Sequence, residues 1–195
     1  MKRFEELPPA QMSAEQLRVV AGAVAGARGR VPVPMQAWLH SPELADRAQR
    51  LGEFARYQTT LAGRLSELAI LVVARTWTAQ YEWFAHRRDA LKAGLGEDVI
   101  AAIAVGREPE FAADDEALVY AFSRSVMLRY GVDDGLYARA TEVLGAQGVV
   151  ELVGILGYYT LVAMTLNVFE MGDVKELEPL VQVGVPPPRP DLQSL

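Results

Sequence analysis

The sequence predicts an all-α protein: an orthogonal bundle of about eight helices without a β-sheet. First, apolar residues recur at helical spacing in several segments, as in Leu118, Phe122, Val126 and Tyr130. Second, Leu65–Lys92 contains neither Gly nor Pro, which favours long helices over short strands. Third, helix start signals such as the pair Ser41-Pro42 precede the periodic segments.

Caps and breakers mark the helices in the first part of the chain. Ser13 is expected to cap a helix that runs to about Ala27, and the Gly and Pro residues of 28–34 favour a loop. Pro34 lies in the first turn of the next short helix, and Ser41 fits the N-cap of a third. The predicted helices here cover residues 13–27, 34–39 and 41–54.

The middle of the chain contains a nearly continuous apolar segment, LAILVVA, at 68–74. In isolation it is also consistent with a buried strand. With its flanks it exceeds ten residues, so we predict a buried helix from Leu65 to about Thr76. The cluster Thr76-Trp77-Thr78 is a poor helix former and is expected to break the helix. The next helix covers 79–93 and ends at Gly94, and others cover 97–104, 114–130, 133–144 and 149–172.

One helical domain is expected to comprise residues 1–178. The tail at 179–195 ends in VPPPRPDLQSL, which is too rich in Pro to be helical. We expect this tail to be either disordered or laid over a neighbouring subunit.

The composition argues against several classes of function. The 195 residues carry a net charge of −6, so there is no basic excess to attract nucleic acid. The chain contains no Cys, which makes a disulfide or a thiolate nucleophile impossible. No apolar stretch follows the first charged residues, and we therefore expect a cytoplasmic protein.

The most apolar segment, Leu152–Leu166, indicates how the protein is assembled. It is shorter than the roughly 20 residues that a bilayer span needs, so a buried helix is expected and a membrane is not. One subunit of this size would struggle to cover such a helix on all sides. The sequence therefore favours a homo-oligomer.

The candidate catalytic residues are Glu82 and His86, with Glu67 upstream. Glu82 and His86 are four residues apart, so they lie on one face of one helix. A carboxylate beside an imidazole favours the protonated ring, which is useful for moving protons near neutral pH. Glu67 lies in an apolar helix, where a lone carboxylate is costly to bury and needs a partner or a function.

A purely structural reading of these residues remains open. A Glu–His pair at this spacing is common on solvated helix faces, and Glu67 also fits the first turn of its helix, where a carboxylate offsets the helix dipole. The only other histidine, His40, is expected to pack near the Ser41 cap. Core or interface positions are expected for the aromatic residues Trp77, Tyr81 and Trp83.

Three segments resemble the signature of the carboxymuconolactone decarboxylase family, which includes the alkyl hydroperoxidase D proteins. They are RLSELAIL at 64–71, AQYEWFAH at 79–86 and ALKAGL at 90–95. In the redox members, a Glu is followed after twelve positions by Cys-x-x-Cys, and four residues beyond the second Cys by a His. Glu67 and His86 match that Glu and His, whereas Ala79 and Glu82 replace the cysteines. A looser match includes GRVP at 29–32 and HSPEL at 40–44.

The resemblance implies an alkyl hydroperoxidase D-like bundle and a trimeric or hexameric assembly. Dithiol peroxidase chemistry is impossible without Cys. By analogy with the decarboxylase branch, His86 would act as the acid or base, Glu82 would orient it, and Glu67 would be a second carboxylate of the pocket. That branch acts on a lactone dicarboxylate, so an Arg should bind the substrate anion. The candidates are Arg56, Arg64 and Arg75.

Two classes of function follow. The first is a cofactor-free lyase that acts on a small carboxylated or lactone-like compound by Glu/His proton transfer. The alternative is a non-catalytic protein that uses the same scaffold to bind a small molecule or to assemble. A metal site is a minor third option, because one His at this spacing is not a zinc signature.

Overall fold

The computed structural model of the chain describes residues 3, 5–172 and 180, and every regular element within them is helical. The predicted all-α class is therefore confirmed. A short 3₁₀ helix at Pro9–Gln11 precedes the bundle. The eight α-helices are α1 (Ala14–Ala25), α2 (Val33–Trp38), α3 (Pro42–Tyr57), α4 (Gly63–Trp77), α5 (Gln80–Lys92), α6 (Glu97–Ala104), α7 (Asp114–Arg129) and α8 (Asp134–Val168).

The ends of these helices follow the expected local chemistry. Ser13 and Gln16 form a reciprocal capping box at the start of α1, in which each side chain accepts a hydrogen bond from the other residue's backbone N–H. Pro42 occupies the first turn of α3, although the Ser41 side chain makes no capping bond. Gly94 follows α5 with φ of +92°, as the prediction of a terminating glycine requires.

Helix α4 is the centre of the protein. Every residue from Leu65 to Ala74 is buried, which confirms the prediction of a buried helix rather than a strand. The helix ends where the sequence indicated a break, because Thr78 adopts the left-handed conformation (φ 49°, ψ 42°) and turns the chain into α5. Residues on α4 and α5 can therefore face each other across this turn.

Helix α8 consists of two helical pieces joined at Gly145, whose φ of 71° and ψ of 166° are not helical. The two pieces correspond to the predicted helices at 133–144 and 149–172, although the second ends at Val168. By length and composition α8 is long enough to cross a membrane, but 61% of its apolar window is buried inside the protein, as in core helices of soluble proteins.

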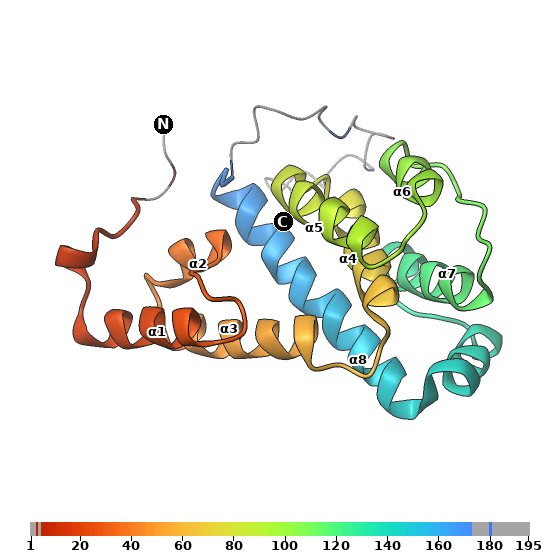
Figure 1. Cartoon of the computed structure of the whole chain (residues 1–195), viewed down its shortest axis with the longest axis horizontal. Helices are drawn as coiled ribbons and strands as arrows, with labels where there is room; N and C mark the ends of the chain where they lie inside the picture. Colours follow the sequence, from red (N-terminus) through yellow and green to blue (C-terminus); the bar gives the residue numbers. More distant parts are fainter. Residues whose placement is uncertain (1–2, 4, 173–179, 181–195) are drawn as a thin grey trace, which may run out of the picture.

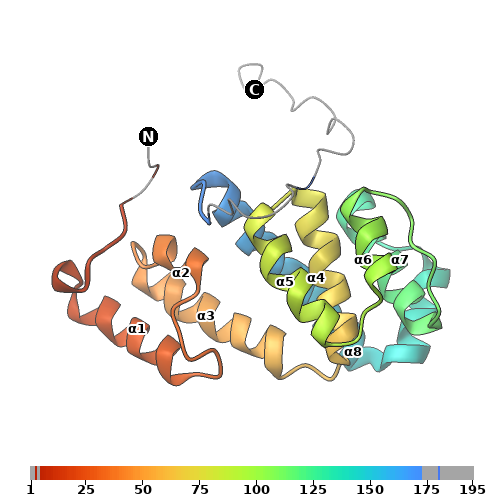
Figure 2. The same cartoon turned by 45° about the horizontal axis from the view of Figure 1, so that its top comes forward.

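The second part of α8 lies between two groups of helices (Figures 1 and 2). Helices α1, α2 and α3 lie on one side of it, and α4, α5, α6 and α7 lie on the other. Both α3 and α4 pack directly against α8. The arrangement brings residues of α3, α5 and α8 around one pocket.

The proposed division into a domain at 1–178 and a tail at 179–195 falls largely outside the described residues. Of the tail, only Leu180 is described. It is buried, and both of its backbone polar groups bond to the Gln80 side chain on α5: Leu180 N–H donates at 2.8 Å and Leu180 O accepts at 3.1 Å.

Candidate active site

The turn at Thr78 brings Glu67 of α4 against His86 of α5. The Nδ1 of His86 donates to Oε2 of Glu67 over 2.7 Å. Both side chains are shielded from solvent, with 6% of His86 and 11% of Glu67 exposed. A hydrogen bond from Nδ1 to a carboxylate fixes the orientation of the imidazole and leaves Nε2 as the ring atom available for chemistry.

The predicted pairing of His86 with Glu82 is wrong. Neither carboxyl oxygen of Glu82 has a hydrogen-bond partner among the described residues. The spacing of four residues places both side chains on one helical face, but it does not decide which carboxylate the imidazole contacts. Glu67 lies on the adjacent helix and takes that position.

Glu82 is a buried acid without a partner. It is only 2% exposed, and this burial raises its carboxyl pKa well above the ordinary value, while neither of its oxygens accepts a hydrogen bond from a described residue. The protonated form is thereby favoured. Glu82 is consequently suited to donate a proton or a hydrogen bond rather than to hold His86 in its charged state.

Glu82 and His86 line one pocket of about 90 Å³. Its walls come from the loop between α1 and α2 and from α2, α3, α5 and α8. Besides these two residues, the lining consists of Arg28, Arg30, Pro32, Val33, Pro34, Arg56, Tyr57, Tyr81, Ala85, Tyr158, Tyr159, Val162 and Leu166. Glu67 is not part of the lining, so of the Glu67–His86 pair only the imidazole side chain faces the pocket.

Two consecutive tyrosines of α8 form the back of this pocket. The ring of Tyr159 packs edge-on against the His86 ring with the centroids 4.8 Å apart, and it packs similarly against Tyr158 at 5.1 Å. Burial raises the pKa of both phenols, so both hydroxyls keep their protons near neutral pH. These residues hold the imidazole in place and add hydroxyl groups to the site.

The structure separates the three arginines that the resemblance made candidates. Arg56 lines the pocket and forms an ion pair with Asp89. Arg64 forms ion pairs with the α7 carboxylates instead, and Arg75 bonds to the hydroxyl of Thr78 over 3.3 Å. Neither of the latter two lines the pocket.

Two arginines of the pocket were missed by sequence reasoning. Arg28 and Arg30 lie in the loop between α1 and α2, which the sequence predicted as a loop with a looser family match at 29–32. The available signals were that match and the basic pair flanking Gly29. They do not reveal that the loop packs over α8.

Unpartnered polar atoms concentrate at this pocket. Seven buried side-chain polar atoms in the described part of the chain have no hydrogen-bond partner. Four of them belong to the pocket residues Arg28 (Nε), Glu82 (both oxygens) and Tyr159 (the hydroxyl). Buried polar atoms are normally paired, so this cluster makes the pocket a candidate site for a polar ligand.

The remaining candidate residues have structural surroundings. Trp83 is buried as expected, whereas Trp77 is 37% exposed and Tyr81 lines the pocket. The His40 ring bonds to the backbone oxygen of Glu5 at 2.9 Å. Among the described residues, no group of three His, Asp or Glu side chains is arranged to hold a metal ion.

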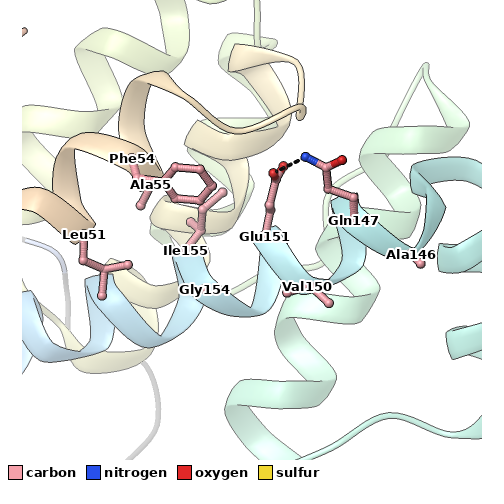
Figure 3. A pocket seen from close by; sticks show the side chains of 9 residues that line it. All are labelled: Leu51, Phe54, Ala55, Ala146, Gln147, Val150, Glu151, Gly154 and Ile155. Carbon is pink, nitrogen blue, oxygen red and sulfur yellow. Dashed lines mark hydrogen bonds between the residues drawn. The ribbon is translucent and has the colours of Figure 1, made fainter.

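A second and larger pocket, of about 500 Å³, lies between α3 and α8 (Figure 3). Its walls are mostly apolar, with Leu51 and Phe54 from α3 and Val150 and Ile155 from α8. The one carboxylate in it, Glu151, already accepts bonds from Gln147 at 2.8 Å and from the backbone and hydroxyl of Thr60 at 2.6 and 2.7 Å. This pocket offers apolar surface that a partner could bury, but its one carboxylate is already hydrogen-bonded.

The fold and the site define a class: an all-α protein with a carboxylate–histidine pair at the junction of two consecutive helices, beside a third buried carboxyl group. Residues 42–123 match the model of the Carboxymuconolactone decarboxylase family, in agreement with the resemblance seen in the sequence, and the chain contains no cysteine. The match extends from the start of α3 into α7 and includes Glu67, Glu82 and His86. No curated protein matches the chain.

Proposed function

We propose that this chain is a cofactor-free lyase that removes carbon dioxide from a small carboxylated or lactone-like compound by proton transfer. The observation that carries the proposal is the shared pocket: it combines an imidazole held by Glu67 with Glu82, a buried and unpartnered acid whose pKa is raised by burial. A protonated carboxyl group beside a general base is the equipment that protonation of a carbanion requires. The family match to residues 42–123 supports the decarboxylase-like reaction class.

The proposed reaction balances with the groups of this pocket. Breaking the bond to the substrate carboxylate releases carbon dioxide and leaves the electron pair delocalised into a conjugated carbonyl as a dienolate. Glu82 donates its proton to the carbon, which forms the new C–H bond and leaves Glu82 ionised. His86, one helical turn away on the same face, returns a proton from solvent to Glu82 while Glu67 stabilises the transient imidazolium.

A screen of carboxylated lactones and related cyclic acids tests the proposal, with carbon dioxide release and ultraviolet absorbance as readouts. We expect turnover by the wild-type protein without added metal, flavin, nicotinamide or thiol. His86→Ala should remove nearly all of it. Glu82→Gln and Glu67→Gln should each lower kcat by about 100-fold, because general acid–base groups typically contribute 10²–10⁴-fold.

The matched control is Glu43→Gln, which removes an exposed carboxylate of α3 that does not line the pocket. It should retain wild-type kcat. If an active substrate is found and His86→Ala converts it like the wild type, the proposed role of this histidine is wrong, and the Glu67–His86 bond is a structural contact between α4 and α5.

We further propose that the protein is a homo-oligomer, as the resemblance implies, with the α3/α8 pocket at the contact between copies. From Ala146 to Val168 the only charged residue of α8 is Glu151, and it is buried. The exposed side of this stretch is therefore uncharged. Its exposed residues are Ala146, Gln147, Val150, Val153, Gly154, Gly157, Met164, Asn167 and Val168. A second copy of this surface would bury these residues without desolvating a charge.

A further inference from the structure

The pocket that contains Glu82 and His86 is positively charged. Three guanidinium groups line it, from Arg28, Arg30 and Arg56, whereas its one carboxyl group belongs to Glu82, whose pKa is raised by burial. Asp89 already neutralises Arg56. The charge left in the pocket therefore comes from the loop between α1 and α2.

Neither guanidinium of this loop, Arg28 or Arg30, has an anionic partner among the described residues, but Arg30 is exposed to solvent whereas Arg28 is partly buried. In the part of the chain that the structure describes, Arg28 forms no ion pair, and its Nε is buried without a hydrogen-bond acceptor. Its one side-chain bond is made by Nη2, which donates to the Tyr158 hydroxyl over 3.4 Å. A partly buried guanidinium in such surroundings favours an anion from outside the chain.

Gly52 makes room for this arrangement. A side-chain carbon at Gly52 would collide with the Tyr158 hydroxyl and would lie 2.7 Å from Nη2 of Arg28. Glycine in the middle of α3 is costly for helix stability, and here its absence of a side chain lets the phenol and the guanidinium approach α3 closely. Gly52 is therefore a positioning residue for Arg28 and Tyr158.

We propose that Arg28, presented by the loop between α1 and α2, binds the carboxylate of a small organic acid in this pocket, with Tyr158 donating a second hydrogen bond. The Tyr158 hydroxyl accepts from Arg28, so its own proton is free to be donated to the same anion. Glu82 then faces an uncharged oxygen or carbon of the same ligand. The inference rests on the proposed function for the identity of the site, and it names the residue that recognises the substrate charge.

Two probes of equal shape test the charge recognition: 2-furoate, a small cyclic carboxylate, and 2-furamide, its neutral amide. Isothermal titration calorimetry on the full chain gives the Kd of each. We expect wild type to bind 2-furoate about 10-fold or more tightly than 2-furamide, because a bond between charged groups is stronger than its neutral counterpart. Arg28→Gln should weaken 2-furoate binding by about 10-fold and leave 2-furamide binding unchanged.

The control for the loss of one positive charge is Arg50→Gln. Arg50 is an exposed residue of α3 that pairs with Asp46 and does not line the pocket, so this variant should bind both probes like the wild type. Equal affinity of wild type for the two probes, no binding of 2-furoate, or undiminished 2-furoate binding by Arg28→Gln would each overturn the proposal.

Gly52→Ala provides an independent test with every charge retained. The added carbon displaces Tyr158 and Arg28, so 2-furoate binding should weaken while a folded protein persists by circular dichroism. Wild-type affinity in this variant would contradict the positioning role. Because the assay needs no turnover, selective binding of 2-furoate without decarboxylation of any compound would refute the proposed reaction and leave the anion site standing.

Discussion

Glu67 and Glu82 are both buried carboxyl groups of the same pocket region, but only Glu67 has a hydrogen-bond partner. This difference in hydrogen bonding follows from where each side chain lies relative to His86. Glu67 faces the imidazole across the turn between α4 and α5, whereas Glu82 lies one turn before His86 on its own helix and has no hydrogen-bond partner among the described residues. Two carboxyl groups with such different surroundings divide naturally into a base partner and a neutral acid.

At this scale the sequence identified the right residues and the wrong pairing. The spacing of Glu82 and His86 is visible along one helix, and it favoured a bond between them. The Glu67–His86 bond depends on how two helices pack after Thr78, which no local pattern encodes. Arg28 and Tyr158 are 130 positions apart, so their contact lies beyond any reading of spacing.

At the scale of the elements, the break in α8 depends on one glycine. Gly145 combines φ of 71° with ψ of 166°, a conformation essentially restricted to glycine. No atom lies within 4 Å of the place where a side-chain carbon would be, so space is not the constraint. The backbone conformation alone requires glycine here, and it sets the angle at which the second part of α8 enters the bundle.

Gly145→Ala should accordingly lower the free energy of unfolding by about 1–3 kcal/mol, the usual cost of a side chain in such a conformation. Denaturant unfolding, monitored by circular dichroism, measures this change in the free energy of unfolding.

The control is Gly22→Ala in α1, where the backbone is helical and the added carbon makes only an ordinary 4.0 Å contact with Gln49. Alanine should stabilise that position by up to about 1 kcal/mol. Equal and small effects of both substitutions would show that Gly145 does not require its glycine conformation.

At the scale of the whole molecule, the sequence predicted the helical class, the buried α4 and both breaks, because periodicity, Gly, Pro and capping residues carry that information locally. Only some of the residues that line the pocket could be predicted from the sequence. Glu82 and His86 lie within the segment at 42–123 that matches the family model, but Arg28, Tyr158 and Tyr159 lie outside it and reach the pocket only when α8 packs between the two groups of helices.

The uncharged surface of α8 leads to a prediction about assembly. We expect light scattering at micromolar concentration to show an oligomer for the wild type and a smaller species for Val150→Asp. Val150 is 71% exposed in one subunit, so the charge should not disturb its folding but would be desolvated between copies.

Val105→Asp is the matched control, since Val105 is also exposed but lies at the end of α6, away from this pocket. Its mass should equal that of the wild type. A monomeric wild-type protein would contradict the proposed assembly.

The proposed reaction requires Glu82 to be a neutral acid in the folded protein, and the pH dependence of stability tests this directly. When a carboxyl pKa is higher in the folded state than in the unfolded state, the folded protein holds the extra proton, and stability falls as pH rises between the two values. The loss is about 1.4 kcal/mol for each pH unit. Glu82→Gln removes this loss, because Gln does not ionise.

The decisive measurement is the free energy of unfolding of wild type and Glu82→Gln from pH 4 to pH 8, with the exposed Glu43→Gln as the control for loss of a carboxylate. We predict that the advantage of Glu82→Gln over wild type grows steadily above about pH 4.5, while Glu43→Gln runs parallel to wild type. An advantage that stays constant across this range, or that shrinks as pH rises, would mean that Glu82 is ionised in the pocket and would contradict the account.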